Sequence, residues 1–201
     1  MSKFIEDALE RLNKSEFIVD DPKNPKTLEI RNAVLIYTNF AGRANNFGNE
    51  SKNFNLIITP EIKDQIERGY FNNLKVKIHE TNKRNPDDPV LYFINVKVNM
   101  LVAYPPIVTL CTDYKGQKSR TPLTDETIGC LDSINMARCD VIVNIKEAKA
   151  RPGWAVFYLR KFNCIQYKNP EFGGAYEDWD DPLQEPNPEI AEQNADIINN
   201  D

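Results

Sequence analysis

The residues best suited to chemistry lie in a polar loop, residues 43–52, with the sequence Arg-Ala-Asn-Asn-Phe-Gly-Asn-Glu-Ser-Lys. The loop holds two cations, Arg43 and Lys52, several amides and one aromatic, Phe47, beside the flexible Gly48. An aromatic ring can stack on a nucleobase while cations hold phosphates, so this combination favours nucleic-acid binding. The alternative is an ordinary hairpin loop whose phenylalanine packs back onto the core, as loop aromatics often do.

Two expected strands, residues 73–79 and 90–99, extend this pattern. In both, aliphatic residues alternate with polar or basic ones, and successive side chains of a strand point to opposite faces. If the aliphatic residues face the core, the other faces present a basic surface with one aromatic, formed by Lys75, Lys77, Phe93 and Lys97. The alternative is a solvated sheet face, because exposed lysines also discourage edge pairing.

A third cluster, residues 151–161, mixes aromatic and basic residues along one expected strand. We expect Phe157 and Leu159 to face inward and Trp154 to be the surface aromatic. Each base stacked on an aromatic ring contributes roughly 1 to 3 kcal/mol, so a few such rings would dominate the non-electrostatic part of binding. The candidate nucleic-acid-binding residues are therefore Arg43, Phe47, Lys52, Lys75, Lys77, Phe93, Lys97 and Trp154.

The elements that must position these residues are mainly strands, which favours a small β-barrel. A helix should begin after Thr59, a good N-cap, with Pro60 in its first turn and Gly69 at its end. A second, amphipathic helix is expected at residues 3–14. Periodicity does not decide the structure of residues 115–138. The expected strands are residues 28–38, 53–59, 73–79, 90–99, 106–113, 140–147 and 153–167.

Catalytic chemistry has little support. Asp140 and the sequence Glu147-Ala-Lys149 resemble the acidic residues of metal-dependent nucleases, but the two carboxylates would bracket one strand and stand about 20 Å apart. The four cysteines include no close pair and His79 is the only histidine, which disfavours a zinc site. We expect no catalytic residue, metal or cofactor, and the magnesium-dependent nuclease ranks as the third hypothesis.

The charge of the chain is divided between two regions. All 25 Lys and Arg precede residue 169, together with 20 of the 30 Asp and Glu, so this body has a net charge of +5. Residues 170–201 hold the other 10 acidic residues and no base, a net charge of −10. This asymmetry indicates a basic body for a polyanion and an acidic tail for something else. The composition of the tail is typical of disorder.

Two blocks of the sequence resemble phage replicative single-stranded DNA-binding proteins, those of short-tailed coliphages and their relatives. The first block is residues 46–60, Asn-Phe-Gly-Asn-Glu-Ser-Lys-Asn-Phe-Asn-Leu-Ile-Ile-Thr-Pro. The second is Trp154 to Gln166, followed by Phe172-Gly-Gly-Ala-Tyr-Glu-Asp-Trp179 and the acidic tail. The resemblance implies a mainly β fold with minor α: a five-stranded OB-like barrel with extra strands, one inserted helix and an N-terminal helix.

The resemblance also implies three regions: an N-terminal helix and linker at 1–25, an OB-fold nucleic-acid-binding domain at 26–169 and a flexible acidic tail at 170–201. Such proteins bind single-stranded DNA without sequence preference in phage replication or recombination. Their tail recruits the phage DNA polymerase and the helicase or primase, and it covers the DNA groove. The tail residues expected to bind partners are Glu177, Asp178, Trp179, Asp180, Asp181, Ile197 and Ile198.

One departure concerns the end of the tail. Tails of this family commonly finish with an aromatic residue, whereas this chain finishes Ile197-Ile-Asn-Asn-Asp201. Either Ile197 and Ile198 replace that anchor, or the tail docks differently.

The rival hypothesis from another class is a virion structural or assembly protein, whose acidic tail binds a partner and whose basic strands are only solvated faces. No apolar run approaches 18 residues and no signal segment opens the chain, so we expect a soluble protein of the host-cell cytoplasm without membrane contact. A homodimer stays open. The preference between DNA and RNA also stays open, because stacking and phosphate contacts serve both.

Overall fold

The computed structural model describes residues 3–19, 25–44, 48, 50–69, 71–81, 89–114 and 117–166. Phe47 and the whole acidic tail, including residues 177–181, Ile197 and Ile198, lie outside the described residues, and what was predicted for them stays a prediction. The described chain is mainly β with minor α, which confirms the predicted fold class.

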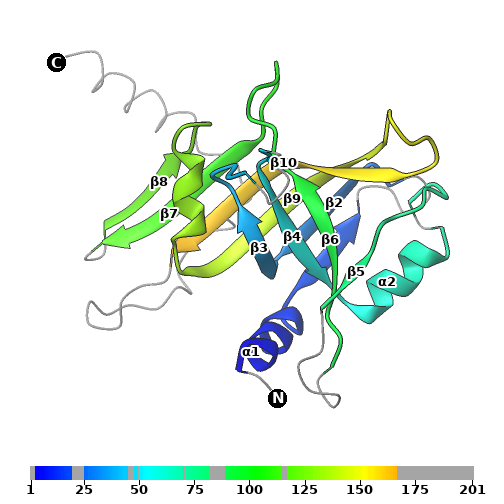
Figure 1. The fold of residues 1–201 in the computed structure, drawn as a ribbon. Helices are drawn as coiled ribbons and strands as arrows, with labels where there is room; N and C mark the ends of the chain where they lie inside the picture. Colours follow the sequence, from blue (N-terminus) through cyan, green and yellow to red (C-terminus); the bar gives the residue numbers. More distant parts are fainter. Residues whose placement is uncertain are drawn as a thin grey trace.

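Within the described residues, ten strands belong to one sheet, and two α-helices and one 3₁₀-helix accompany it (Figure 1). The helices are α1 (Lys3–Leu12), α2 (Pro60–Glu67) and η1 (Ile128–Asp132). The strands are β1 (Glu16–Val19), β2 (Thr27–Arg31), β3 (Leu35–Asn39), β4 (Asn53–Ile58), β5 (His79–Glu80), β6 (Tyr92–Lys97), β7 (Ile107–Tyr114), β8 (Gln117–Pro122), β9 (Met136–Glu147) and β10 (Ala155–Gln166).

The strand pairings close a barrel. Only residues 32–34 separate β2 from β3, so the two act as one bent strand, with β2 paired to β9 and β3 to β4. From β4 the sheet continues around the barrel to β9: β4 pairs with β6, β6 pairs in parallel with β10, and β10 pairs antiparallel with β9. With the bent strand counted once, the order around the barrel is 1-2-3-5-4-1, the arrangement of a five-stranded OB barrel. The other strands are additions, and the β7–β8 hairpin extends to one side (Figure 1).

The bend in the first barrel strand lies at Asn32, whose φ of 51° is in the left-handed region. Its backbone N–H donates a hydrogen bond of 2.7 Å to Oδ1 of the buried Asp140, and Arg138 contacts both oxygens of that carboxylate at 3.0 Å. The prediction of one uninterrupted strand over residues 28–38 was therefore wrong, because the apolar pattern continues through a corner that a distant carboxylate stabilises.

The structure confirms the helix that was predicted after Thr59, α2. Thr59 Oγ1 accepts a hydrogen bond of 3.3 Å from Ile62 N, Pro60 is the first helical residue, and Ile66 is buried. Gly69 has a φ of 88°, and an added Cβ there would collide with the side chain of Asn73. Glycine is therefore required where the helix ends.

The predicted strand at residues 73–79 is only partly correct. Val76 and Ile78 pack against the core while Lys75 and Lys77 are exposed, so the predicted alternation is present. Regular pairing, however, is confined to β5. The undecided segment 115–138 contains β8 and η1, and β1 was not predicted.

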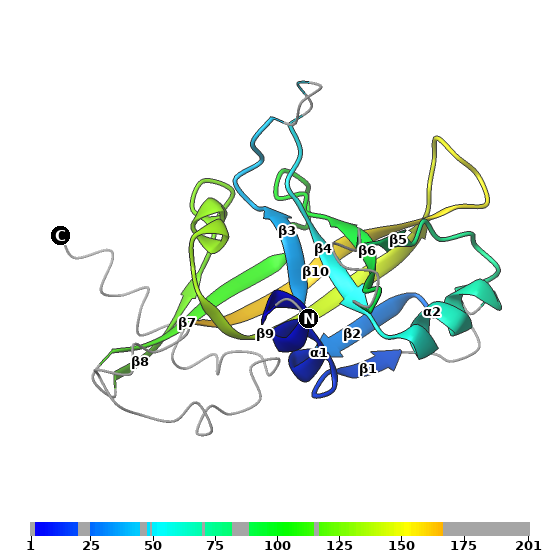
Figure 2. The ribbon, with the colours of Figure 1, turned by 60° about the horizontal axis from the view of Figure 1, so that its bottom comes forward.

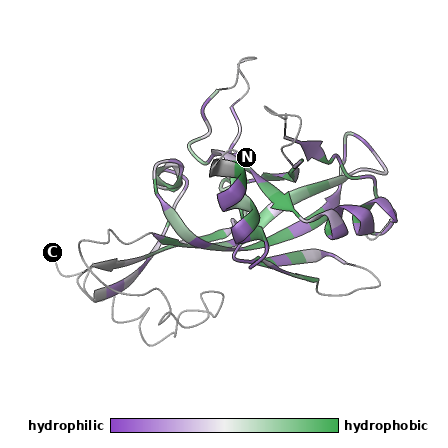
Figure 3. Ribbon diagram, turned by 90° about the horizontal axis from the view of Figure 1, so that it is seen from below, coloured by the Kyte–Doolittle hydropathy of each residue, from purple (hydrophilic) through white to green (hydrophobic). Residues whose placement is uncertain are grey.

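Two apolar clusters lie on opposite sides of the barrel wall. The first fills the barrel and includes the rings of Phe40, Phe54 and Phe162, whose centroids lie 5.4 to 5.9 Å apart. The second lies outside, where α1 packs against the outer face of β3, β4 and β6 (Figure 2). Figure 3 shows hydrophobic and hydrophilic residues alternating along α1, as such a docked helix requires. The second cluster consists of Ile5, Ala8, Leu12, Val34, Ile36, Ile57, Leu91 and Phe93.

Candidate nucleic-acid interface

The outer face of β3, β4 and β6 has a covered half and an open half. The covered half is the set of strand residues under α1. In the open half, polar side chains take the outward positions that alternate with core residues such as Phe54, Leu56 and Val96. We call the following set the open face: Tyr37, Asn39, Asn53, Asn55, Asn95 and Lys97, together with Tyr158 on the neighbouring strand β10.

One row of the open face crosses four strands. Asn39 pairs with Asn53, Asn53 with Lys97, and Lys97 with Tyr158. Neighbouring strands lie about 4.8 Å apart, so these side chains are in lateral contact range. In the adjoining row, Asn95 Nδ2 donates to Asn53 Oδ1 at 3.3 Å and to Asn55 Oδ1 at 3.1 Å. Such amides can hydrogen-bond to phosphates or to base edges.

Tyr37 is the most exposed ring of the open face, with 66% of its surface accessible. It lies in an irregular stretch of β3, between Ile36 and Asn39, and its φ of 48° is unusual for a bulky residue. A strained conformation of this kind costs about 1 to 3 kcal/mol, and such residues cluster at functional sites. Tyr37 thus combines an exposed ring with an unfavourable backbone conformation, which makes it a candidate stacking surface.

Two further rings continue from Tyr37 across the sheet. The ring of Phe93 lies 5.8 Å from that of Tyr37, edge to face, and His79 stacks on Phe93 at 5.3 Å with an interplanar angle of 10°. Burial lowers the pKa of His79, and the nearby charge of Lys77 lowers it further. The imidazole is thus neutral at neutral pH and behaves as an aromatic ring rather than as a cation.

Cations lie beside the rings. Lys97 is exposed next to Tyr158, and Lys146 Nζ lies 5.8 Å from the centroid of the Tyr158 ring. Arg43 is also exposed, and its backbone is tied to the open face. Its N–H donates to Asn39 Oδ1 at 2.8 Å and its carbonyl accepts from Asn39 Nδ2 at 3.0 Å. Alternating rings and cations can hold bases and phosphates together.

Two sequence predictions are corrected. Phe93 is only 9% exposed because α1 and the neighbouring rings cover it, so its prediction as a surface aromatic was wrong. The side chain of Lys52 is 18% exposed, and its Nζ pairs with the Asp125 carboxylate and donates to the Asp125 carbonyl at 2.7 Å. Lys52 therefore anchors the β3–β4 loop and does not stand free for a phosphate.

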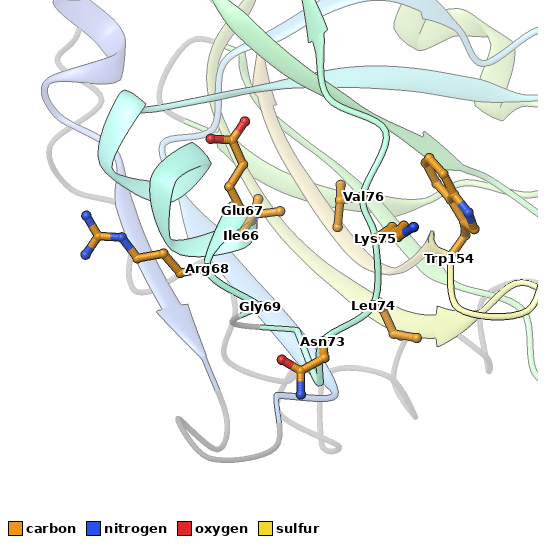
Figure 4. A pocket seen from close by; sticks show the side chains of 9 residues that line it. All are labelled: Ile66, Glu67, Arg68, Gly69, Asn73, Leu74, Lys75, Val76 and Trp154. Carbon is orange, nitrogen blue, oxygen red and sulfur yellow. The ribbon is translucent and has the colours of Figure 1, made fainter.

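The structure brings Lys75 and Trp154 together at a pocket of about 470 Å³ beside the end of α2 (Figure 4). The two segments are joined by hydrogen bonds of 2.8 Å, from Lys75 N to Gly153 O and from Ala155 N to Lys75 O. The Arg151 guanidinium lies 3.6 Å from the Trp154 ring centroid and occupies one face of the ring. Trp154 precedes Tyr158 by four residues, about 13 Å along an extended chain. The lining residues are Ile66, Glu67, Arg68, Gly69, Asn73, Leu74, Lys75, Val76 and Trp154.

The residues considered for a nuclease have structural partners. Asp140 holds the bend at Asn32, whereas Glu147 accepts a hydrogen bond of 2.6 Å from Gly153 N in the β9–β10 hairpin. No group of three His, Cys, Asp or Glu side chains is placed to hold a metal ion in the part of the chain that the structure describes.

Sequence reasoning missed Tyr37, Tyr158, Lys146 and the asparagines of the open face. One signal could have found the asparagines, because Asn is depleted in strands and here occupies strand positions repeatedly. No sequence pattern could have identified Tyr37. Its outward position depends on an irregular β3–β4 pairing, which the spacing of residues does not predict.

Comparisons with known proteins give the family of the chain. The family model of the phage ssDNA-binding domain matches residues 20–173. A similar solved structure is the C-terminally truncated single-stranded DNA-binding protein from bacteriophage Enc34, with 14% identity, coverage of 77% of this chain and 95% of that chain, and a TM-score of 0.42. Among curated proteins, none matches the sequence. Within the described residues, no helix is both long and apolar enough to cross a membrane.

Proposed function

This chain belongs to the phage ssDNA-binding domain family, and we propose that it binds single-stranded DNA without sequence preference through the open face. The family match carries the proposal of single-stranded DNA as ligand. The exposed Tyr37, on the same sheet face as the asparagines and Lys97, supports the open face as the place of binding. As a member of a family of binding domains, the chain is not an enzyme.

In the proposed mechanism, aromatic rings bind the bases and cations bind the phosphates. Tyr37 and Tyr158 stack on bases, a contact that tolerates any sequence because every base has a π face. Lys97 and Arg43 bind the phosphates, which releases counterions and makes the affinity fall as salt rises. The asparagine amides hydrogen-bond to the sugar–phosphate backbone, which positions the strand without reading its sequence.

We extend the path of the strand to the other predicted residues that the structure leaves accessible. Lys75 and Lys77 are exposed, and Trp154 immediately precedes β10, the β-strand that carries Tyr158. Single-stranded DNA that leaves the open face along β10 would therefore reach the pocket beside α2. In the sequence Phe47 follows Arg43 by four residues, between β3 and β4, and we propose it as one more stacking ring.

We also propose that the chain acts in phage DNA replication or recombination and that its acidic tail has two roles. The −10 charge of residues 170–201 complements the +5 body, which supports a tail that masks the DNA-binding surface when no DNA is present. Almost all of the tail follows the family match, which ends at residue 173. This separation supports a second role for the tail, the recruitment of the phage DNA polymerase and helicase or primase.

The test measures fluorescence anisotropy of labelled single-stranded DNA, single-stranded RNA and duplex DNA of one length, at low and at raised salt. The full chain should bind single-stranded DNA more tightly than duplex, and binding should weaken with salt. Deletion of Glu171 to Asp201 should raise the affinity, because ten carboxylates no longer compete for the same cations. Equal binding to duplex, or no binding at low salt, refutes the function. Unchanged affinity after the deletion refutes only the masking role.

A further inference from the structure

The segment between β6 and β7, together with the first residue of β7, exposes apolar side chains to solvent. Leu101 is 81% exposed, Val102 44%, Tyr104 94% and Ile107 55%. No Lys, Arg, Asp or Glu occurs between Lys97 and Asp113. Exposed apolar groups gathered in this way commonly mark a binding site. We call residues 99–106 the apolar loop.

The apolar loop is held at both ends. Val98 N donates to Lys52 O at 2.9 Å, and Leu101 N donates to the Asn99 side-chain oxygen at 3.1 Å. Met100 packs against the barrel core. At the other end Pro105 and Pro106 restrict the backbone, and Pro106 is buried. Tyr104 therefore projects from a fixed base, which lowers the entropy that binding would cost.

The apolar loop leaves the barrel directly from the open face. Lys97 is the last residue of β6 before the loop, and it pairs with Asn53, which pairs with Asn39. This row marks the end of β6, the start of β4 and the end of β3, so the apolar loop and the β3–β4 loop leave the same end of the three strands (Figures 1 and 2). Lys97 and Arg43 lie at the bases of the two loops.

We infer that the apolar loop is a second base-stacking site for the strand that occupies the open face, with Tyr104 as the stacking ring and Leu101 as an apolar contact beside it. The inference rests on the proposed function. A loop without a cation has no charge to attract a phosphate, whereas its exposed ring and aliphatic side chain fit a nucleobase. Continuity with Lys97 places these bases next to phosphates bound at the open face.

The test compares two ligands with the same number of phosphates: an oligothymidylate and a base-free deoxyribose-phosphate oligomer. In the full chain, Tyr104→Ala should weaken binding of oligothymidylate by about 5- to 150-fold, the range that corresponds to one stacked base. Binding of the base-free oligomer should stay within about 2-fold, because stacking is absent from it. Tyr104→Phe should keep most of the affinity, and Ile18→Ala, an exposed apolar residue on β1, is the matched control.

The outcomes separate the inference from the proposed function. If the wild-type chain binds no single-stranded DNA, the proposed function fails. If wild type binds and Tyr104→Ala binds oligothymidylate equally well, only the inference fails. Equal losses on both ligands also overturn it, since they indicate a phosphate contact or a disturbed fold. Sedimentation tests the other occupant: a wild-type dimer that Tyr104→Ala dissociates, with unchanged affinity for a short oligothymidylate, assigns the loop to a second copy of the chain.

Discussion

The covered half and the open half of one sheet face carry different kinds of side chain, although β3, β4 and β6 contribute to both. Under α1, outward positions carry Val34, Ile36, Ile57 and Phe93, which form a small apolar core. A few residues further along the same strands, the outward positions carry asparagines and Lys97. Helix α1 thus separates the two halves. It buries the covered half and leaves the open half accessible to a ligand.

The contrast is sharpest between two rings that touch. Phe93 and Tyr37 lie 5.8 Å apart, but Phe93 is 9% exposed and Tyr37 is 66% exposed. The first should therefore contribute to stability and the second to binding. Substitutions on either side of this boundary test whether the division is real.

The largest effect is expected for Phe93→Ala, which should lower the free energy of unfolding by about 3 to 5 kcal/mol, the range for a buried phenylalanine. The expected loss combines lost apolar burial with a cavity beneath α1 and beside His79. Urea denaturation followed by circular dichroism measures it. A loss below about 1 kcal/mol would mean that α1 does not cover the ring in solution.

Tyr37→Ala should have the opposite profile. Affinity for single-stranded DNA should fall by about 1 to 3 kcal/mol through lost stacking, while the free energy of unfolding changes by less than about 1 kcal/mol. Tyr37→Phe keeps a ring and should bind almost as wild type. Anisotropy titration and urea denaturation of the same samples give both numbers, and a destabilised protein with normal affinity would reverse the assignment of the two halves.

Lys97→Gln should change the salt dependence of binding more than the stability. Removing one phosphate contact should reduce the slope of log K against log salt by about 0.7 for a single strand. Lys14→Gln is the matched control, because Lys14 is exposed outside the open face and pairs with Glu10. Equal slopes for wild type and Lys97→Gln would show that Lys97 makes no phosphate contact.

The smallest effect concerns His79, at the boundary between the halves. Burial lowers its pKa in the folded protein below the usual 6.5, so the unfolded chain takes up its proton first as the pH falls. Its contribution to stability is present above about pH 6.5 and is lost as the pH falls through the lowered pKa. Urea denaturation from pH 8 to pH 5 should show this loss, and His79→Phe should reduce it. An identical pH dependence in both proteins would contradict the role of His79.

What could be predicted from the sequence depended on how far apart the cooperating residues lie. Helix α2 was predictable because Thr59, Pro60 and Gly69 act within one short segment. The alternation of β6 was equally readable, with Ile94 and Val96 inward. The alternation could not reveal that α1 covers Phe93, since the two segments meet only in the folded protein.

The candidate site was predictable to a similar extent. Lys97 and Arg43 are exposed as expected, because a charged side chain on a strand or loop has few other places to lie. Lys52 differed because Asp125 reaches it from a segment whose structure the sequence left undecided. Phe47 and the tail residues stay predictions.

The bend at Asn32 has a consequence for the order in which the chain can fold. Its backbone is held by Asp140, 108 residues later, and β2 finds its barrel partner only in β9. A nascent chain leaving the ribosome can pair β3 with β4 and β6 early, but the ring of strands stays open until β9 and β10 have emerged. Pairings between such distant segments form slowly and leave strand edges unpaired in the meantime. We therefore expect slow refolding, and aggregation of chains that stop before β9.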